Sequence, residues 1–155
     1  MKVIHFSKIK KVDKEIVIGI GKFDGVHLGH KKILMTVSEE AKKKGRVPAV
    51  VTFKNFPVEF LLCRWEEKLS LLEKSGIRLC IWSDFDEMSH ISHKEFVDIL
   101  IKAGVKTIVV GYNFHFGKGR KGNIGFLRKM AEKKNFSVIV VPPYKKRGKA
   151  VSASL

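Results

Sequence analysis

The chain has 155 residues, which is the size of one globular domain with a sizeable hydrophobic core. Its 31 lysine and arginine residues against 15 aspartate and glutamate residues give a net charge of +16, which would attract polyanions, nucleic acid included. No apolar run approaches the roughly 18 residues of a membrane-spanning helix, and residues 1–14 lack the apolar core of a signal peptide. We therefore expect a cytoplasmic protein that does not enter a membrane.

The basic residues are scattered in short runs along the chain. No zinc-finger spacing, RNP-like aromatic strand or basic heptad region accompanies them. We therefore expect no nucleic-acid partner beyond non-specific electrostatic binding at low salt. The two cysteines, Cys63 and Cys80, do not have the spacing of a metal site. We interpret them as reduced thiols of a cytoplasmic protein, and a disulfide between them is the alternative.

The N-terminal third predicts a strand–helix–strand unit. A short strand is expected at residues 3–6, and a basic connector leads to an apolar strand at residues 16–20. A glycine-bearing turn follows, and then a helix over residues 31–44 with apolar residues at Ile33, Leu34, Val37 and Ala41. Gly45 ends this helix, and residues 47–53 form a second buried strand. Strands in this order are joined by a right-handed crossover and lie parallel.

The remaining elements continue the alternation of strand and helix. Residues 54–64 are expected to be irregular, residues 83–91 to form an acidic and polar loop, and residues 112–123 to be a glycine-rich, basic segment. Ser92 and Glu95 form a capping box that opens a helix. The expected elements are helix 65–75, strand 77–82, helix 94–103, strand 106–110, helix 124–134 and strand 136–141. The pattern predicts an α/β fold, a doubly wound (Rossmann-like) parallel sheet with helices on both faces.

The turn after the strand at residues 16–20 contains the strongest candidate functional residues. Residues 21–30 read Gly-Lys-Phe-Asp-Gly-Val-His-Leu-Gly-His, between a buried strand and a helix start, where α/β proteins hold phosphates. His27 and His30 are three residues apart, a spacing that puts both rings on one face of a first helical turn. The alternative is that His30 faces water and the glycines only make a tight turn. The interleaving of three glycines with two histidines favours a polyphosphate site.

This stretch resembles the signature of the His-x-Gly-His nucleotidyltransferase superfamily. Its Phe-Asp-Gly-Val-His sequence resembles that of the N-terminal FMN adenylyltransferase module of bacterial bifunctional riboflavin kinase/FAD synthetase. The resemblance implies a FAD-synthesising enzyme that transfers AMP from ATP to FMN, with Mg²⁺ as cofactor and pyrophosphate as the second product. It implies that His27 and His30 are catalytic and that the nucleotide is bound by Gly21, Lys22, Phe23, Asp24, Gly25 and Gly29.

A second element follows the strand at residues 106–110. Residues 111–117 read Gly-Tyr-Asn-Phe-His-Phe-Gly and resemble the family's Gly-x-Asp/Asn-Phe-x-Phe-Gly element. The resemblance implies that Asn113 is a catalytic residue in the ATP–magnesium region and a candidate metal contact, and that Gly111 lies against the nucleotide. It also makes Phe116 a candidate flavin contact, with a loop anchor in the core as the alternative.

A third element, residues 52–57, resembles the family's Thr-Phe-x-Pro-His-Pro element but departs from it. Asn55 replaces the expected proline and Phe56 the expected histidine, so the geometry on the flavin side differs from the family's. Phe53 and Phe56 are candidates to stack on the isoalloxazine ring. Packing in the core is the alternative for both rings.

A fourth element, residues 151–155, matches the start of the family's Ile-Ser-Ser-Thr-x-Ile-Arg signature, which implies nucleotide contacts for Ser152 and Ser154. The arginine of that signature is not reached. We expect one nucleotidyltransferase domain over residues 1–155 that is C-terminally incomplete relative to the family. A riboflavin kinase domain is not expected within these residues and would follow them in a full-length protein.

Ligands of such a sheet sit over the carboxyl ends of its strands. We therefore expect the segments 21–30, 52–57, 111–123 and 142–155 to line one cleft. Three alternative functions stay open. They are a nucleotidyltransferase of the same superfamily with another phosphorylated acceptor, a flavin- or nucleotide-binding module with weak or lost turnover, and a basic nucleic-acid binder whose affinity falls steeply with salt.

Overall fold

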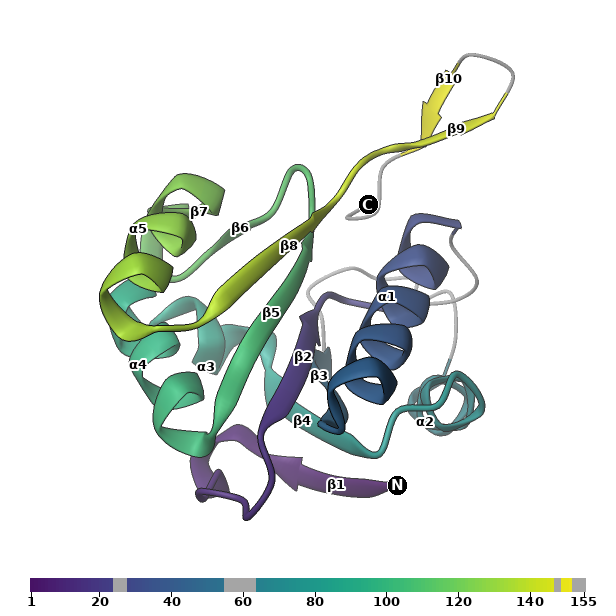
Figure 1. Ribbon diagram of the computed structural model, residues 1–155, viewed down its shortest axis with the longest axis horizontal. Coiled ribbons are helices and arrows are strands. Elements are labelled where there is room, and N and C mark those ends of the chain that lie inside the picture. Colours follow the sequence, from purple (N-terminus) through teal and green to yellow (C-terminus); the bar gives the residue numbers. More distant parts are fainter. Residues whose placement is uncertain (24–27, 55–63, 147–148, 152–155) are drawn as a thin grey trace.

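The computed structural model describes residues 1–23, 28–54, 64–146 and 149–151. Its centre is a six-stranded parallel sheet in the order β1-β4-β3-β2-β5-β8 (Figure 1). β3 and β4 lie on one side of β2, and β5 and β8 lie on the other, so the sheet is doubly wound, as the alternation predicted. The strands are β1 (Lys2–His5), β2 (Ile16–Ile20), β3 (Val47–Lys54), β4 (Leu79–Asp84), β5 (Val105–Gly111) and β8 (Ser137–Val141).

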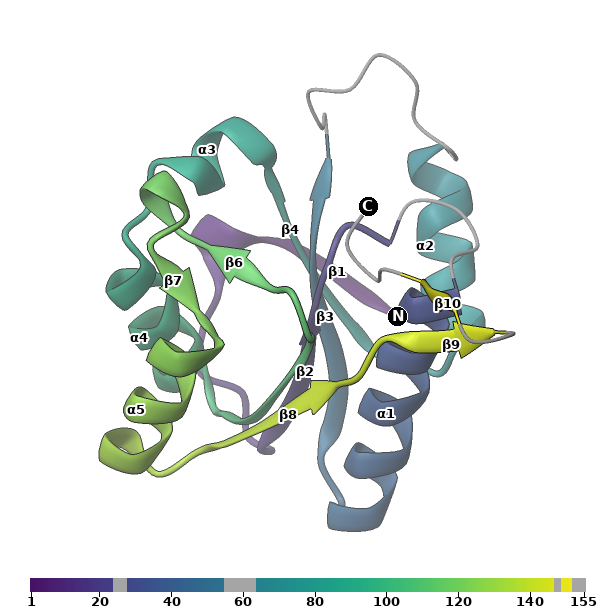
Figure 2. The ribbon, with the colours of Figure 1, turned by 90° about the horizontal axis from the view of Figure 1, so that it is seen from above.

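Helices cover both faces of the sheet (Figure 2). α1 (Leu28–Lys44) and α2 (Trp65–Lys74) lie on one face, and α3 (Phe85–Ser89), α4 (His93–Ala103) and α5 (Ile124–Lys134) lie on the other. Because side chains alternate along a strand, β2 contributes to both cores: Ile18 packs into the core with α4 and α5, and Val17 packs into the core with α1. Gly19 lets α1 approach closely, since a Cβ there would lie 2.9 Å from Val37 Cγ2.

Capping contacts support the predicted ends of α4 and the predicted start of α5. The Ser92 hydroxyl accepts a hydrogen bond from the Glu95 backbone N–H at 3.1 Å, which opens α4, and Gly104 closes that helix with φ at +110°. The Asn123 side chain accepts from the Phe126 N–H at 2.8 Å at the start of α5. These contacts satisfy N–H groups that have no partner within the helix.

The prediction of a loop at residues 83–91 is wrong, because this segment contains the helix α3. Its Met88 is buried and Phe85 lines a cavity one helical turn away. The acidic side chains of Asp86 and Glu87, which favoured a loop by composition, lie in the first turn of the helix. There they are stabilised by the positive end of the helix dipole.

Other boundaries shift for local reasons. The strand expected at 77–82 begins at Leu79, because Gly76 has φ at +93° and the Ile77 N–H donates back to the Leu72 carbonyl at the end of α2. Phe6 starts a short 3-10 helix, η1 (Phe6–Lys8). Two hairpins were not predicted: β6 (His115–Phe116) with β7 (Gly122–Asn123), which enclose the 3-10 helix η2 (Lys118–Arg120), and β9 (Tyr144–Lys146) with β10 (Lys149–Val151).

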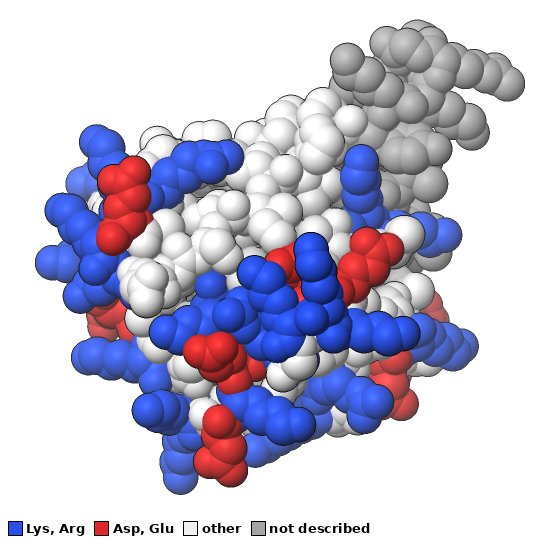
Figure 3. All heavy atoms as spheres, viewed as in Figure 1, with Lys and Arg blue, Asp and Glu red and all other residues white. Residues whose placement is uncertain are grey.

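Positive charge is spread widely over the face shown in Figure 3. Lysines lie in the last turns of α1, α2, α4 and α5, where the negative ends of the helix dipoles stabilise them. These helix ends lie on the side of the sheet where the strands begin, opposite the carboxyl ends of the strands. Within the described residues, no helix is both long and apolar enough to span a membrane.

Cys80, on β4, is a fully buried free thiol, as expected for a reduced cysteine, whereas Cys63 lies outside the described residues. Burial raises the pKa of the Cys80 thiol to about 11, opposed by a smaller effect of the Lys68 ammonium. In an unfolded chain the thiol ionises near its ordinary pKa of about 8.5. The folded state therefore holds a proton that the unfolded state releases, and the free energy of unfolding should fall as pH rises from about 8.5 to about 11.

We expect Cys80 to resist alkylation by iodoacetamide at pH 8 while the protein is folded. The raised pKa alone lowers the thiolate fraction at pH 8 by roughly 200-fold, and burial blocks the reagent. The measurement is the mass of the Cys80 peptide after labelling in buffer and in urea, where the unfolded chain provides the control. Rapid labelling of the folded protein would contradict the buried, neutral thiol.

Candidate active site

The candidate site lies over the carboxyl ends of β2 and β5. These strands are neighbours, and the winding of the sheet reverses between them. β2 runs into the glycine-bearing turn that starts at Gly21, and β5 ends at Gly111, where the second motif begins. The crevice at such a switch point is where open α/β sheets bind ligands, so the topology brings together two motifs that are far apart in the sequence.

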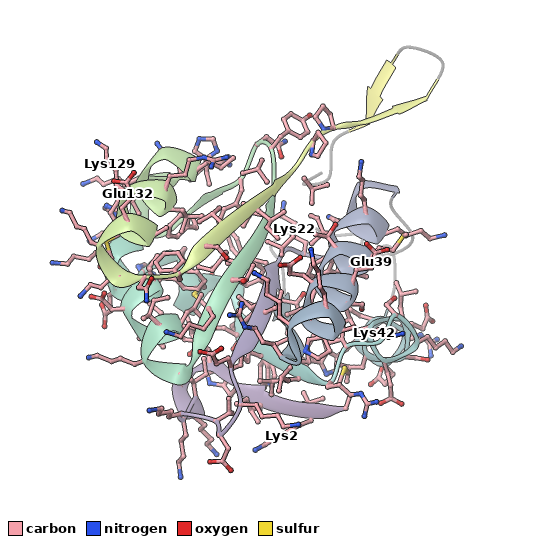
Figure 4. The ribbon with its side chains drawn as sticks, in the orientation of Figure 1. Lys2, Lys22, Glu39, Lys42, Lys129 and Glu132 are labelled. Atoms are coloured by element: carbon pink, nitrogen blue, oxygen red, sulfur yellow. The ribbon has the colours of Figure 1, made fainter. Side chains whose placement is uncertain are left out.

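The start of the turn is held against β3 by two hydrogen bonds. The Gly21 N–H donates to the Val51 carbonyl at 3.1 Å, and the Thr52 hydroxyl donates to the Lys22 carbonyl at 2.8 Å. Lys22 therefore leaves the sheet in a fixed direction. Figure 4 shows it at the end of β2, between the strands and α1.

Phe23 has an unusual backbone conformation, with φ at +53°, and its side chain is fully buried. A non-glycine residue in the left-handed region is strained by about 1–2 kcal/mol, and such strain is concentrated at functional sites. The ring packs edge-on against the His30 imidazole, with 5.3 Å between ring centroids. A Cβ on Gly21 would lie 3.0 Å from the Phe23 ring, so glycine at that position leaves room for it.

His30 is the third residue of α1, which begins at Leu28, three residues before the expected start, and Gly29 is the second. The His30 side chain is only 5% exposed. The first turn of α1 contains no acidic residue, so the helix does not neutralise its own positive end there. Its first N–H groups have no acceptor within the helix. The position suits an anion such as a phosphate.

One cavity, with a volume of about 330 Å³, opens at this end of the sheet. Its lining includes residues of three of the four segments expected to share a cleft: Gly21 and Lys22, Phe53, and Gly111 with Asn113. The described residues of the fourth segment, 142–155, do not line it. Described residues of the segments 21–30, 52–57 and 111–123 thus contribute to one cavity, whereas His30 is not among its lining residues.

The far wall of the cavity is aromatic. Phe114 and Phe116 are stacked, with ring centroids 5.2 Å apart. The centroid of the Phe116 ring also lies 5.5 Å from that of Phe96 on α4. Phe116 is 9% exposed, so most of its ring belongs to the core and one edge lines the cavity. Gly122 permits this packing, since a Cβ there would lie 2.6 Å from the Phe116 ring.

Two features of this region were not found from the sequence. α3 contributes Phe85, Met88 and Ser89 to the cavity wall. The apolar pair Phe85 and Met88, three residues apart, was the available signal, but the surrounding acidic residues obscured it. The second is Lys68 of α2, which is 3% exposed and reaches the end of β3. A lysine in a charged helix segment gives no signal of burial in the sequence.

Several predicted site residues lie outside the described residues. They are Asp24, Gly25, His27, Phe56, Ser152 and Ser154. Their assigned roles stay predictions. The same holds for the pairing of His27 with His30 on one helical face.

No group of three or more His, Cys, Asp or Glu side chains that could hold a metal ion is found in the described ranges. Mg²⁺ is held in nucleotide sites by substrate phosphates with few protein ligands, and it prefers oxygen. Asn113 is among the residues that line the cavity, and its side chain carries an amide oxygen. The residues present therefore fit a magnesium ion that is bound together with a nucleotide.

The fold and the position of the cavity place the chain in the Rossmann-like class of α/β proteins, which bind nucleotides at this switch point. A family model described as FAD synthetase matches residues 9–155. The chain therefore belongs to the FAD synthetase family.

Curated relatives agree with this membership. A bifunctional riboflavin kinase/FMN adenylyltransferase from Buchnera aphidicola subsp. Schizaphis graminum is 32% identical over 169 residues, covering 100% of this chain and 54% of that protein. The protein of the same name from Bacillus subtilis is 33% identical and covers 80% of this chain and 44% of its own length. A FAD synthetase from Listeria monocytogenes is 32% identical, covering 92% and 62% respectively. The chain spans about half the length of the first two of these relatives.

A solved structure has the same fold. The crystal structure described as a macrolide-efflux protein from Streptococcus pneumoniae superposes with a TM-score of 0.82 and 24% sequence identity. The match covers 99% of this chain and 55% of that one. At this identity the similarity concerns the fold alone.

Proposed function

We propose that the chain is an FMN adenylyltransferase, which transfers AMP from ATP to FMN and gives FAD and pyrophosphate. The observation that carries the proposal is the single cavity at the switch point. One side of it is the phosphate-binding type of turn at Gly21 and Lys22, and the other is a wall of phenylalanine rings. An aromatic wall suits a planar flavin ring, and a turn before a helix N-terminus suits phosphates. Its volume lies within the usual range for small-molecule sites.

The reaction requires no covalent enzyme intermediate. A phosphate oxygen of FMN forms a bond to the α-phosphorus of ATP, and the bond from that phosphorus to the bridging oxygen breaks. Pyrophosphate leaves with the electron pair. Since the nucleophile is already an anion, catalysis rests on positioning the two phosphates and stabilising the developing charge.

The described residues have distinct parts in this mechanism. His30 donates a hydrogen bond to an ATP phosphate oxygen, at the positive end of α1. Phe23 holds the His30 ring in place through the edge contact between the two rings. Lys22 adds positive charge beside the phosphates. Gly111 leaves room for the nucleotide, and Phe53 and Phe116 border the flavin ring.

Magnesium supplies charge neutralisation on the phosphates when it is bound with ATP. Asn113 is the described side chain that we assign to this region of the cavity. The proposed nucleotide site is completed by Asp24, Gly25, His27, Gly29, Ser152 and Ser154. The proposed flavin site is completed by Phe56.

We infer that residues 1–155 act as one adenylyltransferase domain, which operates in the cytoplasm. The names of the Buchnera and Bacillus relatives include riboflavin kinase activity. A riboflavin kinase domain is accordingly the partner that we propose for this domain in a longer protein.

The test is an assay with purified protein, ATP, Mg²⁺ and FMN, in which FAD and pyrophosphate are measured together. We expect the two products in equal amounts. Riboflavin in place of FMN is the control, and it should give no product because it lacks the attacking phosphate. If ATP and FMN raise the melting temperature but no FAD forms, the chain is a binding module and the proposed activity is wrong.

A further inference from the structure

Lys68 is the most deeply buried charged residue among those that the structure describes. It lies on α2 and is 3% exposed, whereas Lys74, on the same helix, is exposed. Lysine is almost never fully buried unless its ammonium is hydrogen-bonded, because desolvating the charge is costly. Its position therefore calls for an explanation beyond helix formation.

The Lys68 ammonium binds the end of β3. It donates to the Phe53 carbonyl at 2.8 Å and lies 3.5 Å from the Thr52 hydroxyl oxygen. It also lies 5.7 Å from the centroid of the Trp65 ring, within the range of a cation–π interaction. Lys68 thus connects α2 to the last part of β3, the strand next to the glycine-bearing turn.

Thr52 passes this connection on to the turn. Its hydroxyl has one hydrogen, which it donates to the Lys22 carbonyl at 2.8 Å, so towards the ammonium the hydroxyl oxygen acts as the acceptor. The direction of the chain is therefore fixed from Lys68 to Thr52 to Lys22. Hydrogen bonds in such chains polarise and strengthen one another in a buried setting.

The Lys22 end of this chain borders the cavity, and so does Phe53, whose carbonyl accepts from Lys68. The neighbouring bond from the Gly21 N–H to the Val51 carbonyl spans the same two strands. A shift of the turn relative to β3 would change the distance between the phosphate side and the flavin side of the site. A displacement of 1 Å is enough to lower a rate strongly when catalysis depends on positioning.

We propose that Lys68 is a positioning residue, which sets the place of the nucleotide-binding turn through Thr52. The inference rests on the proposed function for its catalytic consequence. Its structural consequence, the anchoring of residues 21 and 22, stands apart from any activity.

The first experiment compares Lys68→Met with Lys74→Met. Methionine keeps the length of the lysine side chain and removes the ammonium. We expect Lys68→Met to raise the Kd for ATP about tenfold, the effect of losing a hydrogen bond to a charged group, while Lys74→Met leaves it unchanged. If both variants bind ATP like the wild type, Lys68 does not position the turn.

The second experiment changes the middle of the chain, and it stands even if Lys68→Met fails to fold. Thr52→Val removes the hydroxyl at constant shape, and Thr52→Ser keeps it. We expect Thr52→Val to weaken ATP binding and Thr52→Ser to retain it. The double variant of Lys68→Met with Thr52→Val should be no weaker than Lys68→Met alone, because residues of one network are not additive. Additive losses would overturn the proposal.

The third experiment separates the positioning role from the proposed activity. Hydrogen exchange of the Gly21 amide is followed by NMR without any ligand, with the Val109 amide in the adjacent β5 as the internal control. We expect Gly21 to exchange faster in Lys68→Met and in Thr52→Val, and Val109 to be unchanged. If Gly21 responds but the wild type forms no FAD, the proposed activity fails and the anchoring holds. An unchanged Gly21 in both variants refutes the anchoring.

Discussion

Replacing His30 with alanine should lower kcat/KM for FAD formation by about 10²–10³-fold, which is the scale of losing one donor to a transition-state oxyanion. His30 is in the first turn of α1, and in the proposed mechanism its side chain and the helix dipole act on the same phosphate oxygens. The measurement is steady-state kinetics with ATP and FMN, with FAD followed by chromatography.

The matched control for this variant is His90→Ala, since His90 is exposed at the end of α3. His30 also packs on Phe23, so the melting temperature of His30→Ala shows whether the turn still folds. A folded His30→Ala protein with wild-type turnover would remove His30 from the mechanism. A loss of turnover with unchanged folding would support its role in catalysis.

Replacing Gly117 with alanine should lower the free energy of unfolding by about 2–5 kcal/mol, from overpacking together with backbone strain. Gly117 has φ at +78°, and a Cβ there would lie 2.7 Å from the His93 backbone nitrogen and 2.8 Å from its Cα. Backbone atoms at the start of α4 cannot move aside like the end of a side chain. Because Gly117 also lines the cavity, we expect FMN binding to weaken as well. Urea unfolding and flavin fluorescence are the two measurements.

Gly119 provides the comparison for Gly117. It also has a positive φ, of +65°, but the nearest atom to an added Cβ is 3.9 Å away. Gly119→Ala should therefore cost only the backbone strain, about 1–2 kcal/mol. An equal loss of stability in the two variants would mean that the contact with His93 contributes nothing.

The order of the strands and helices could be predicted because each strand of the sheet is an apolar run between turn residues. The buried run of β2 and the apolar face of α1 are both visible in the sequence, and so is the capping pair of Ser92 and Glu95. In a doubly wound sheet this order also determines which strand ends meet. The proximity of Gly21 and Gly111 thus followed from local patterns.

The parts that could not be predicted depend on tertiary packing. The short helix α3 consists of residues whose composition suits a loop, and it is stabilised by burying Met88 against the sheet. The left-handed backbone of Phe23 is unfavourable for that residue by itself. Its burial beside His30 becomes visible only once α1 is packed on β2. The burial of Lys68 likewise depends on how α2 meets the end of β3.

The pairing of β2 with β5 has a consequence for synthesis on the ribosome. β2 and β3 are made before β5 and can pair once α1 has formed, but the other wall of the cavity comes from β5 and the hairpin after it. A nascent chain that has not yet emerged beyond residue 111 can contain the histidine motif without a pocket. Closing the sheet across such a sequence separation is a slow, non-local step. The ligands can therefore stabilise only the later folding stages, in which both halves of the site are present.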